Sequence, residues 1–377
     1  MRIGLDALLL DRYDSGVEIY IRGLVRALAR LDREHEFVVY LARDARPPDV
    51  EGNPRFTFRR APFRGRSRAL RILWEQGRLP RALVRDGIDV FHALGYVMPV
   101  RSSVPTVVTM HDVIALKHPE LCKPSNAAHY RLMLPRAASR AQRIVASSEA
   151  TKADIVSLLG APAEKVTVVY PGLDEAFLAN DGRDDEVRSK HHLPEQYILF
   201  VGNIEPKKNL TALLTAYDFL RTQRAVDMPL VLVGRKAWKY GPVFDAIRSY
   251  GMNDRVLLRG YVEREDLPGI YRMAAVFVFP SLVEGFGLPL LEAMASGVPV
   301  VASNAPAVPE AVGDAALTVP PDDGLLLGRT VCKVLQNSFL RSRLIERGRE
   351  RVQRFSWRDT ARKMLAVYAD LRRAEKA

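Results

Sequence analysis

The sequence predicts an α/β protein made of two doubly wound parallel-sheet domains. Short runs of β-branched and aromatic residues alternate with segments of helical periodicity, which is typical of parallel strands covered on both faces by helices. The alternation stops at a polar segment over 179–196 and then resumes at Tyr197. A chain of 377 residues is long enough to form two such cores.

The first series of predicted elements opens with a strand at Arg2–Asp6, a loop at 11–16 and a helix at 17–31 with apolar residues at helical spacing. The remaining strands of this series are short and apolar: 37–42, 56–58, 89–92, 106–110, 143–146 and 166–169. Between them, 66–85 is an amphipathic helical segment that Pro80 divides into two pieces. Its leucines, among them Leu70 and Leu73, together with Val84, are predicted to form a buried stripe.

The segment 179–196 is polar, carries Asp181-Gly182 and lacks periodicity, so it is predicted to be a linker. A second alternating series follows, and its predicted strands are 197–202, 229–233, 256–259, 275–279, 298–302 and 316–319. No internal sequence repeat links the two series. Three helical segments end the chain, at 324–336, 338–355 and 357–374.

The stretch Ser281–Val301, SLVEGFGLPLLEAMASGVPVV, contains the most informative pattern. A buried strand is followed by Glu284-Gly285-Phe286-Gly287 and then by a helix that begins near Leu288, with Pro289 in its first turn. The N–H groups of a first helical turn, together with the helix dipole, favour anions, and glycines let a ligand approach the backbone. A carboxylate beside a phosphate repels it, so Glu284 and Glu292 suggest hydrogen bonds to sugar hydroxyls. An ordinary strand-to-helix turn with two unrelated glutamates is the alternative.

This stretch resembles the Glu-x7-Glu signature of retaining glycosyltransferases of family 4, whose fold is GT-B: two Rossmann-like domains facing a cleft. The resemblance implies that Glu292 binds the ribose hydroxyls and that Glu284 binds the transferred sugar. It also implies that the amides of Gly285, Phe286, Gly287 and Leu288 face the donor diphosphate.

The same resemblance implies a domain organisation. An N-terminal acceptor-binding domain is expected over 1–178, ending after the family's Pro-Gly-x-Asp at Pro171–Asp174. The linker 179–196 leads to a nucleotide-sugar-binding domain over 197–355. A C-terminal helix, 356–377, is expected to cross back to the first domain.

Two further segments of the first domain resemble the family. His111-Asp112 follows a strand within VTMHDVIALKHPE, and the family's histidine there contacts the transferred sugar, although a histidine at a strand end is often structural. Gly16, in SGVEIYIRGLVRAL, corresponds to the glycine loop that faces the donor diphosphate. Val17-Glu18 stands where many members have a second glycine.

The segment Gly202–Leu210, GNIEPKKNL, places a lysine pair at a strand-to-helix junction, which suits a phosphate but is also compatible with exposed surface lysines. It resembles the family's Gly-Arg-x4-Lys stretch, in which the lysine, here Lys208, binds the donor diphosphate. Asn203 replaces the family's arginine, and Lys207 is a candidate for the missing charge. Val262, after another strand, is expected either to contact the base edge or to pack in the core.

The composition narrows the possible partners. The net charge is +12. Residues 55–85 are rich in arginine and contain a single acid, Glu75. The arginines are Arg55, Arg59, Arg60, Arg64, Arg66, Arg68, Arg71, Arg78, Arg81 and Arg85. A phosphorylated substrate, an anionic membrane surface and nucleic acid all fit this charge, as does a solvated helix face. No nucleic-acid-binding motif is present, so no nucleic-acid partner is expected.

The location and the metal requirement follow from other features. The N-terminus does not resemble a signal peptide, no apolar run approaches the length of a membrane span, and Cys122 and Cys332 form no motif. A cytoplasmic protein, peripheral at the inner membrane face, is expected. Because no Asp-x-Asp is present, neither a metal nor another cofactor is expected, and the nucleotide sugar is a substrate.

The segments MHDVIALKHPE, EPKKN and FSWRDTARKMLAVY resemble bacterial mannosyltransferases of polysaccharide and O-antigen (lipopolysaccharide) assembly, which use GDP-mannose. A lipid-linked or oligosaccharide acceptor is therefore expected. UDP- and dTDP-sugars remain alternative donors. A sugar-nucleotide epimerase, a phosphorylase and a non-catalytic nucleotide-binding protein remain alternative functions on the same scaffold.

Overall fold

A computed structural model describes residues 1–10, 15–223 and 226–376. The chain forms two compact units. Unit 1 comprises Met1–Pro119, Pro124–Gly172 and Phe355–Ala377, and unit 2 comprises Glu120–Lys123 and Leu173–Arg354. Of the loop expected at 11–16, residues 11–14 lie outside the described part of the chain.

Unit 1 is built on a seven-stranded parallel sheet with the strand order β3-β2-β1-β4-β5-β6-β7. Its strands are β1 (Arg2–Asp6), β2 (Glu36–Leu41), β3 (Phe56–Arg60), β4 (Val90–Ala93), β5 (Thr106–Met110), β6 (Arg143–Ala146) and β7 (Val166–Val168). The order reverses between β1 and β4, so the carboxyl ends of these two strands are where a doubly wound sheet usually binds ligands.

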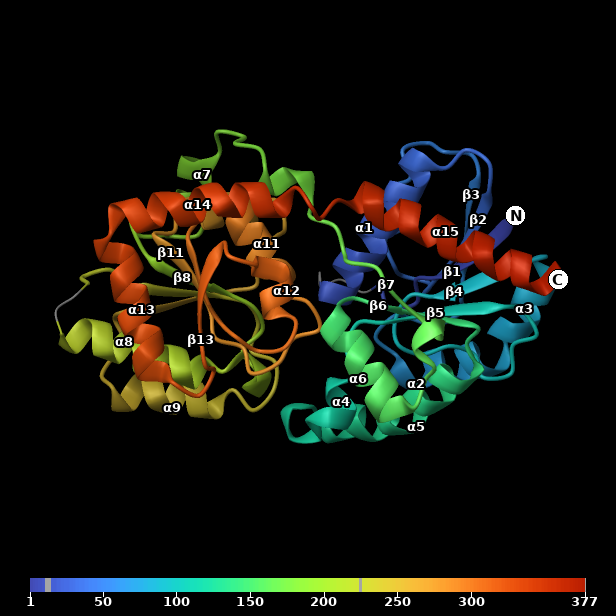
Figure 1. Cartoon of the computed structure of the whole chain (residues 1–377), viewed down its shortest axis with the longest axis horizontal. Helices are drawn as coiled ribbons and strands as arrows, with labels where there is room; N and C mark the ends of the chain where they lie inside the picture. Colours follow the sequence, from blue (N-terminus) through green and yellow to red (C-terminus); the bar gives the residue numbers. More distant parts are fainter. Residues whose placement is uncertain (11–14, 224–225, 377) are drawn as a thin grey trace. The chain divides into compact units, whose positions relative to one another are not determined.

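Helices cover both faces of this sheet. They are α1 (Gly16–Leu31), α2 (Arg68–Gly77), α3 (Leu79–Arg85), α4 (Ile114–Lys117), α5 (Pro124–Arg140), α6 (Glu149–Leu159) and α15 (Trp357–Lys376), with 3-10 turns η1 (Pro119–Leu121) and η2 (Ala163–Lys165). Figure 1 shows α1 and α15 on one side of the strands and α5 and α6 on the other. Each face has its own cluster of buried apolar side chains.

The start of α1 explains Glu18 in the glycine segment. The backbone N of Ser15 donates to Glu18 Oε2 at 2.9 Å, and the backbone N of Glu18 donates to Ser15 Oγ at 3.3 Å. This is a capping box, which satisfies two helix-terminal donors reciprocally. Glu18 therefore has a structural role at this position, as part of the cap of α1.

The last helix, α15, packs beside α1 in unit 1. Buried His92 of β4 joins it to the sheet, since its Nδ1 lies 2.7 Å from Tyr368 Oη and its Nε2 lies 2.7 Å from Thr109 Oγ1. A Cβ on Gly172 would lie 2.2 Å from the backbone N of Trp357. The Pro-Gly-x-Asp segment thus needs its glycine because the start of α15 passes directly against it.

Unit 2 is built on a six-stranded parallel sheet with the order β10-β9-β8-β11-β12-β13. Its strands are β8 (Ile198–Val201), β9 (Leu230–Val233), β10 (Val256–Gly260), β11 (Val276–Phe279), β12 (Val300–Ser303) and β13 (Ala316–Val319). The prediction of two doubly wound parallel sheets is confirmed, and each predicted strand is present within a few residues of its expected bounds.

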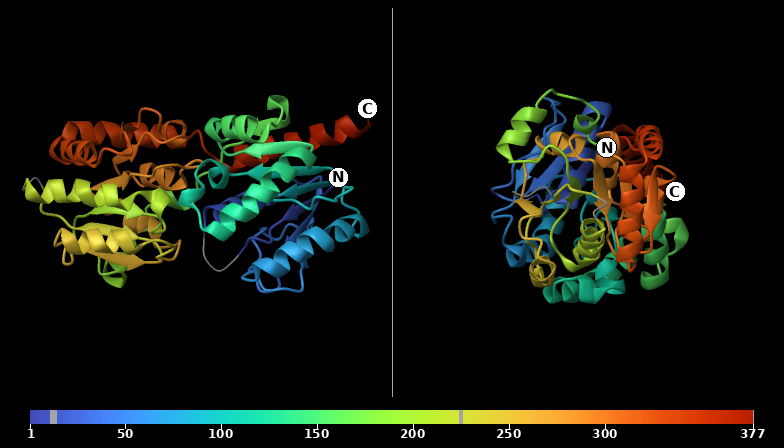
Figure 2. Two further views of the ribbon diagram at one scale, coloured as in Figure 1. Left: turned by 90° about the horizontal axis from the view of Figure 1, so that it is seen from below. Right: turned by 90° about the vertical axis from the view of Figure 1, so that its left-hand side faces the viewer.

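The helices of unit 2 also form two layers. They are α7 (Asp184–Lys190), α8 (Leu210–Thr222), α9 (Gly241–Ser249), α10 (Leu267–Arg272), α11 (Leu288–Ala295), α12 (Val308–Val312), α13 (Gly324–Gln336) and α14 (Ser338–Val352), with η3 (Glu175–Phe177) and η4 (Pro206–Lys208). Figure 1 shows α11 and α14 on one side of the sheet and α8 and α9 on the other. The layers of each unit can also be followed in Figure 2.

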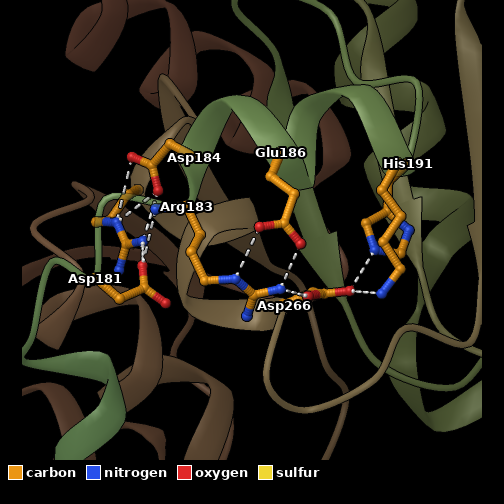
Figure 3. A network of polar contacts seen from close by, with 8 residues as sticks. Asp181, Arg183, Asp184, Glu186, His191 and Asp266 are labelled. Atoms are coloured by element: carbon orange, nitrogen blue, oxygen red, sulfur yellow. Dashed lines mark hydrogen bonds and ion pairs between the residues drawn. The ribbon is translucent and has the colours of Figure 1, made fainter.

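The segment expected to be a linker contains α7, which packs on α10 in unit 2. Figure 3 shows Arg183 and His191 directed toward the buried carboxylate of Asp266. His191 Nε2 donates to Asp266 at 2.8 Å and Lys190 Nζ does so at 2.6 Å. The segment resembles a linker in sequence because its charged residues lack periodicity. In the structure these residues form ion pairs with Arg272 of α10 and with Asp266, which directly precedes α10.

The predicted buried stripe of the arginine-rich segment is wrong in part. The division into two helices is confirmed, since α2 ends at Gly77 and α3 begins at Leu79. However, Leu70 is 51% exposed, Leu73 is 68% exposed and Val84 is 60% exposed. Leu79 and Leu83 are buried as expected. Periodicity identified an amphipathic helix, but it could not show which apolar residues contact the core.

None of the helices described in unit 1 or unit 2 is both long enough and apolar enough to cross a membrane.

Candidate active site

The turn between β11 and α11 has the conformation that its glycines suggested. Gly287 lies at the N-cap of α11 with φ of +104°, a backbone conformation that L-residues rarely adopt. A Cβ at this position would also lie 2.7 Å from Leu290 Cδ1. The turn therefore depends on glycine both for its backbone angle and for its packing.

The first turn of α11 offers few amides to an anion. Pro289 has no N–H, and the backbone N of Leu290 donates to the Gly287 carbonyl at 3.0 Å. Neither residue 289 nor residue 290 can therefore donate to an anion, and the predicted donors stay the amides of Gly285, Phe286, Gly287 and Leu288. The side chain of Phe286 is buried, so only its backbone could serve such a ligand.

Lys208 and Glu284 meet in unit 2, although 76 residues separate them in sequence. Lys208 Nζ donates to Glu284 Oε1 at 2.6 Å and lies 4.9 Å from the centre of the Phe279 ring. The backbone N of Leu282 donates to the Lys207 carbonyl at 2.8 Å, which joins the two loops. A lysine ammonium has three N–H groups, so Lys208 can hold Glu284 and still donate to a second anion.

The charges around Glu284 favour its ionised form. Burial alone would raise the pKa of Glu284, but the positive charges of Lys208 and Lys207 and the hydrogen bond from Lys208 outweigh it. The pKa of Glu284 is therefore below its usual value, and the side chain is a carboxylate at neutral pH. A carboxylate accepts hydrogen bonds and cannot donate them, which suits sugar hydroxyls.

Glu292 is buried, and its two oxygens already have protein partners. Arg264 Nη1 donates to Oε1 at 3.1 Å, and Tyr271 Oη donates to Oε2 at 3.1 Å. Arg264 also donates to Asp174 at 3.2 Å. Each carboxylate oxygen has two lone pairs, so Glu292 retains the capacity to accept from a vicinal diol.

The other residues predicted in unit 2 take different positions. Asn203 follows Gly202 at the end of β8, and Lys207 Nζ lies 3.5 Å from Glu205 Oε1. The side chain of Val262 is only 4% exposed, which matches the packing alternative. Any contact of Val262 with a base would therefore use its backbone.

His111 and Gly16 belong to unit 1. His111 Nε2 donates to the Leu94 carbonyl at 2.9 Å, so the neutral ring has its lone pair on Nδ1. Burial lowers the pKa of His111, against the opposing effects of the Leu94 carbonyl and Asp112. The ring of Tyr20, in the helix α1 that begins at Gly16, packs edge-on against the imidazole of His111, with 4.7 Å between the ring centres. His111 is thus a neutral, oriented hydrogen-bond acceptor.

Sequence reasoning missed two residues that hold this site together. Asn209, in the left-handed conformation with φ of +53°, donates to the Pro280 carbonyl at 3.1 Å and to the Pro321 carbonyl at 2.6 Å. It fixes the lysine turn beside the loop of Glu284. An asparagine directly after the lysine pair was a usable signal, because asparagine tolerates this conformation. Arg264 had no such signal.

The described residues of the chain contain no group of three or more His, Cys, Asp or Glu side chains placed to hold a metal ion.

Comparison with known proteins identifies relatives of both halves of the chain. Residues 15–177 match the family described as Glycosyltransferase Family 4, and residues 183–351 match Glycosyl transferases group 1. The O-antigen chain mannosyltransferase B of Escherichia coli is 31% identical over 288 residues, which cover 76% of this chain and 75% of the relative.

Two solved structures share the fold over nearly the whole length. A sucrose-phosphate synthase from Thermosynechococcus elongatus has a TM-score of 0.80 at 22% identity, covering 99% of this chain and 100% of its own. Anabaena HepE, in complex with UDP and glucose, has a TM-score of 0.75 at 18% identity, covering 98% of this chain and 100% of its own.

Proposed function

Because the chain belongs to glycosyltransferase family 4, whose members are retaining enzymes with the GT-B fold, we propose that it transfers mannose from GDP-mannose. The proposed acceptor is a hydroxyl of a lipid-linked or oligosaccharide glycan in bacterial cell-surface polysaccharide synthesis. The contact between Lys208 and Glu284 supports this proposal, because the cation proposed to bind the diphosphate lies beside the carboxylate proposed to accept hydrogen bonds from the sugar.

In the proposed reaction, the bond between the sugar C1 and the β-phosphate oxygen breaks, and a bond from C1 to the acceptor oxygen forms on the same face. The acceptor proton passes to the departing phosphate oxygen. Negative charge develops on the diphosphate as it leaves, and preorganised donors stabilise it most when they are already in place. Lys208 and the amides of 286–288 would supply this stabilisation, so the scheme needs no metal.

Three side chains have proposed roles in binding the donor. Glu284 accepts hydrogen bonds from hydroxyls of the transferred sugar, and Glu292 accepts them from the ribose. His111 accepts a sugar hydroxyl through Nδ1. Glu284 is not assigned as a nucleophile. Its carboxylate is held in an ion pair with Lys208, which stabilises its negative charge and so makes the carboxylate less reactive.

The donor can be identified by a thermal-shift screen of nucleotide sugars. A ligand that binds only the folded state raises the free energy of unfolding, and with it the melting temperature. At a ligand concentration of 100 times Kd the free energy of unfolding rises by about 2.7 kcal/mol. We expect GDP-mannose to give the largest shift. A larger shift with UDP-glucose would instead identify UDP-glucose as the donor. This second candidate is suggested by the complex of HepE with UDP and glucose. The absence of any shift would contradict the proposed function.

We further propose that unit 1 meets its lipid-linked acceptor at an anionic membrane surface. The support is the exposure of Leu70 and Leu73 on α2, within a segment rich in arginine. Apolar side chains that enter the lipid boundary and cations that face anionic headgroups are the usual elements of an interfacial helix.

Vesicle sedimentation tests this surface. The protein should bind phosphatidylglycerol vesicles more strongly than phosphatidylcholine vesicles. Because each buried leucine contributes roughly 1.5–3 kcal/mol, Leu70→Ser with Leu73→Ser should weaken binding by more than about tenfold. Leu325→Ser with Leu326→Ser, at exposed positions of α13, is the matched control. Equal binding to both vesicle types would count against this surface.

A further inference from the structure

Tyr96 lies in the loop after β4 and has a backbone conformation that is unusual for so large a side chain. Its φ is +69°, in the left-handed region where bulky residues are rarely found. The backbone N of Val97 donates to the Gly95 carbonyl at 2.8 Å, which closes a three-residue γ-turn centred on Tyr96. A γ-turn with a positive central φ is rare and strained. Such strain persists only where the surrounding contacts impose it, and it is concentrated at functional sites.

The ring of Tyr96 contacts the histidine of the candidate site. It packs edge-on against the imidazole of His111, with 5.3 Å between the ring centres and 71° between the ring planes. Tyr20 packs edge-on against the same imidazole. The ring of Tyr96 also packs on Tyr130 of α5, with 5.1 Å between the ring centres. Two tyrosine rings therefore restrict the imidazole, and the second of them is itself supported by a helix.

The hydroxyl of Tyr96 holds the residue next to His111. Tyr96 Oη donates to Asp112 Oδ2 at 2.8 Å, and Asp112 Oδ1 accepts the backbone N–H of Ile114 at 3.0 Å. The carboxylate of Asp112 thus joins Tyr96 to the first residue of α4. Because φ sets the direction of the Cα–Cβ bond, both the ring contact and this hydrogen bond depend on the γ-turn.

The backbone around the γ-turn fixes the imidazole from another direction. The backbone N of Tyr96 donates to the carbonyl of Thr109, which ties the turn to β5 at 2.8 Å. The Leu94 carbonyl, just before the turn, accepts from His111 Nε2 at 2.9 Å. With the proton on Nε2, the acceptor of the neutral ring is Nδ1. The segment 94–96 therefore sets both the tautomer and the orientation of the imidazole.

We propose that Tyr96 is a positioning residue for His111, and that its strained γ-turn is retained because it directs the tyrosine ring to the imidazole and the hydroxyl to Asp112. The inference rests on the proposed function for the role of His111, which accepts a sugar hydroxyl through Nδ1. Tyr96 touches neither the sugar nor the nucleotide in this scheme. A misplacement of about 1 Å can lower a rate by about 10²-fold, so a strained backbone that prevents it is consistent with selection for activity.

Tyr96→Phe is the first test, because it keeps the ring and removes only the hydrogen bond to Asp112. We expect kcat/KM for GDP-mannose to fall by about tenfold, less than the roughly 10²-fold loss for a full misplacement. The Kd for GDP, which lacks the transferred sugar, should stay the same. Tyr40→Phe is the matched control, because Tyr40 Oη donates to Asp86 Oδ2 at 3.0 Å, also in unit 1. It should leave kcat/KM unchanged.

The state of the imidazole is measured without substrate, by long-range ¹H–¹⁵N NMR of the full chain labelled at histidine. His111→Gln assigns the signals of His111 among the seven histidines. The wild type should show a protonated Nε2 and an acceptor Nδ1. Tyr96→Gly accepts the positive φ without strain but lacks the ring and the hydroxyl. Its two nitrogen resonances should move toward each other as the imidazole samples both tautomers, and kcat/KM should fall by about 10²-fold.

Unchanged imidazole resonances in both Tyr96 variants would overturn the proposal, as would an equal loss of kcat/KM in Tyr40→Phe. Tyr96 variants that melt lower than the wild type but keep its kcat/KM and its imidazole resonances would show that the γ-turn is structural only. If Tyr96→Gly fails to fold, Tyr96→Phe decides alone. A wild type that transfers no sugar would refute the proposed function, and the resonances would still test whether Tyr96 orients His111.

Discussion

Replacing Lys208 with methionine should abolish most of the transferase activity. Loss of one preorganised donor to a developing charge typically lowers kcat by about 10²–10³-fold. Lys208 holds Glu284 at 2.6 Å, and we propose that it also stabilises the leaving diphosphate. The expected result, measured as initial rates of mannose transfer at saturating donor, is a loss in kcat that exceeds the change in KM.

This variant needs a stability control. The side chains of Lys208 and Glu284 are 12% and 10% exposed. Removing one partner of a fully buried ion pair destabilises proteins by about 3–5 kcal/mol, so the loss of one partner here should cost somewhat less. Lys208→Met with Glu284→Gln removes both charges, so the fold should recover while activity stays low. A double variant that melts near the wild type and keeps its kcat within a few fold would show that the pair is structural only.

Replacing Glu292 with alanine should weaken binding of the donor nucleotide. If the carboxylate accepts from both ribose hydroxyls, each lost bond to a charged group removes about 1.5–3 kcal/mol, so Kd should rise by at least roughly tenfold. Calorimetry with GDP and with 2′,3′-dideoxy-GDP isolates this effect. The wild type should discriminate between the two nucleotides, whereas the variant should bind them with similar affinity.

Tyr271→Phe is the matched control for Glu292. It removes the protein's own hydrogen bond to Oε2 but leaves the carboxylate and its contact with Arg264 in place. Nucleotide affinity should therefore be retained or increased. Persistent discrimination between GDP and the dideoxy nucleotide in Glu292→Ala would remove the ribose assignment.

The sequence was sufficient to predict the fold because the fold depends on local periodicity and on the order of elements. It failed where long-range contacts decide the outcome. The charged segment around α7 resembled a linker in sequence, but Arg183, Lys190 and His191 contact Asp266 of unit 2. Leu70 and Leu73 have the spacing of a buried stripe, yet they lie on the outer side of α2.

The candidate site follows the same division. The turn around Gly287 was predictable, because strand, glycine and helix are contiguous there. The partners of Glu292 were not, since Arg264 and Tyr271 precede it by more than twenty residues and resemble ordinary surface and core residues in sequence. Nor could the sequence show that the buried Oε1 atom of Glu75 accepts no hydrogen bond from the described residues, because that depends on the folded chain.

The central claim is that a sugar nucleotide binds to unit 2 between the lysine turn and the start of α11. A crystal structure of the protein soaked with GDP-mannose tests it most directly. The account predicts diphosphate oxygens within hydrogen-bond distance of Lys208 Nζ and of an amide in 286–288, with the ribose hydroxyls on Glu292. A donor bound elsewhere, with neither Lys208 nor this turn in contact with its phosphates, would contradict the account.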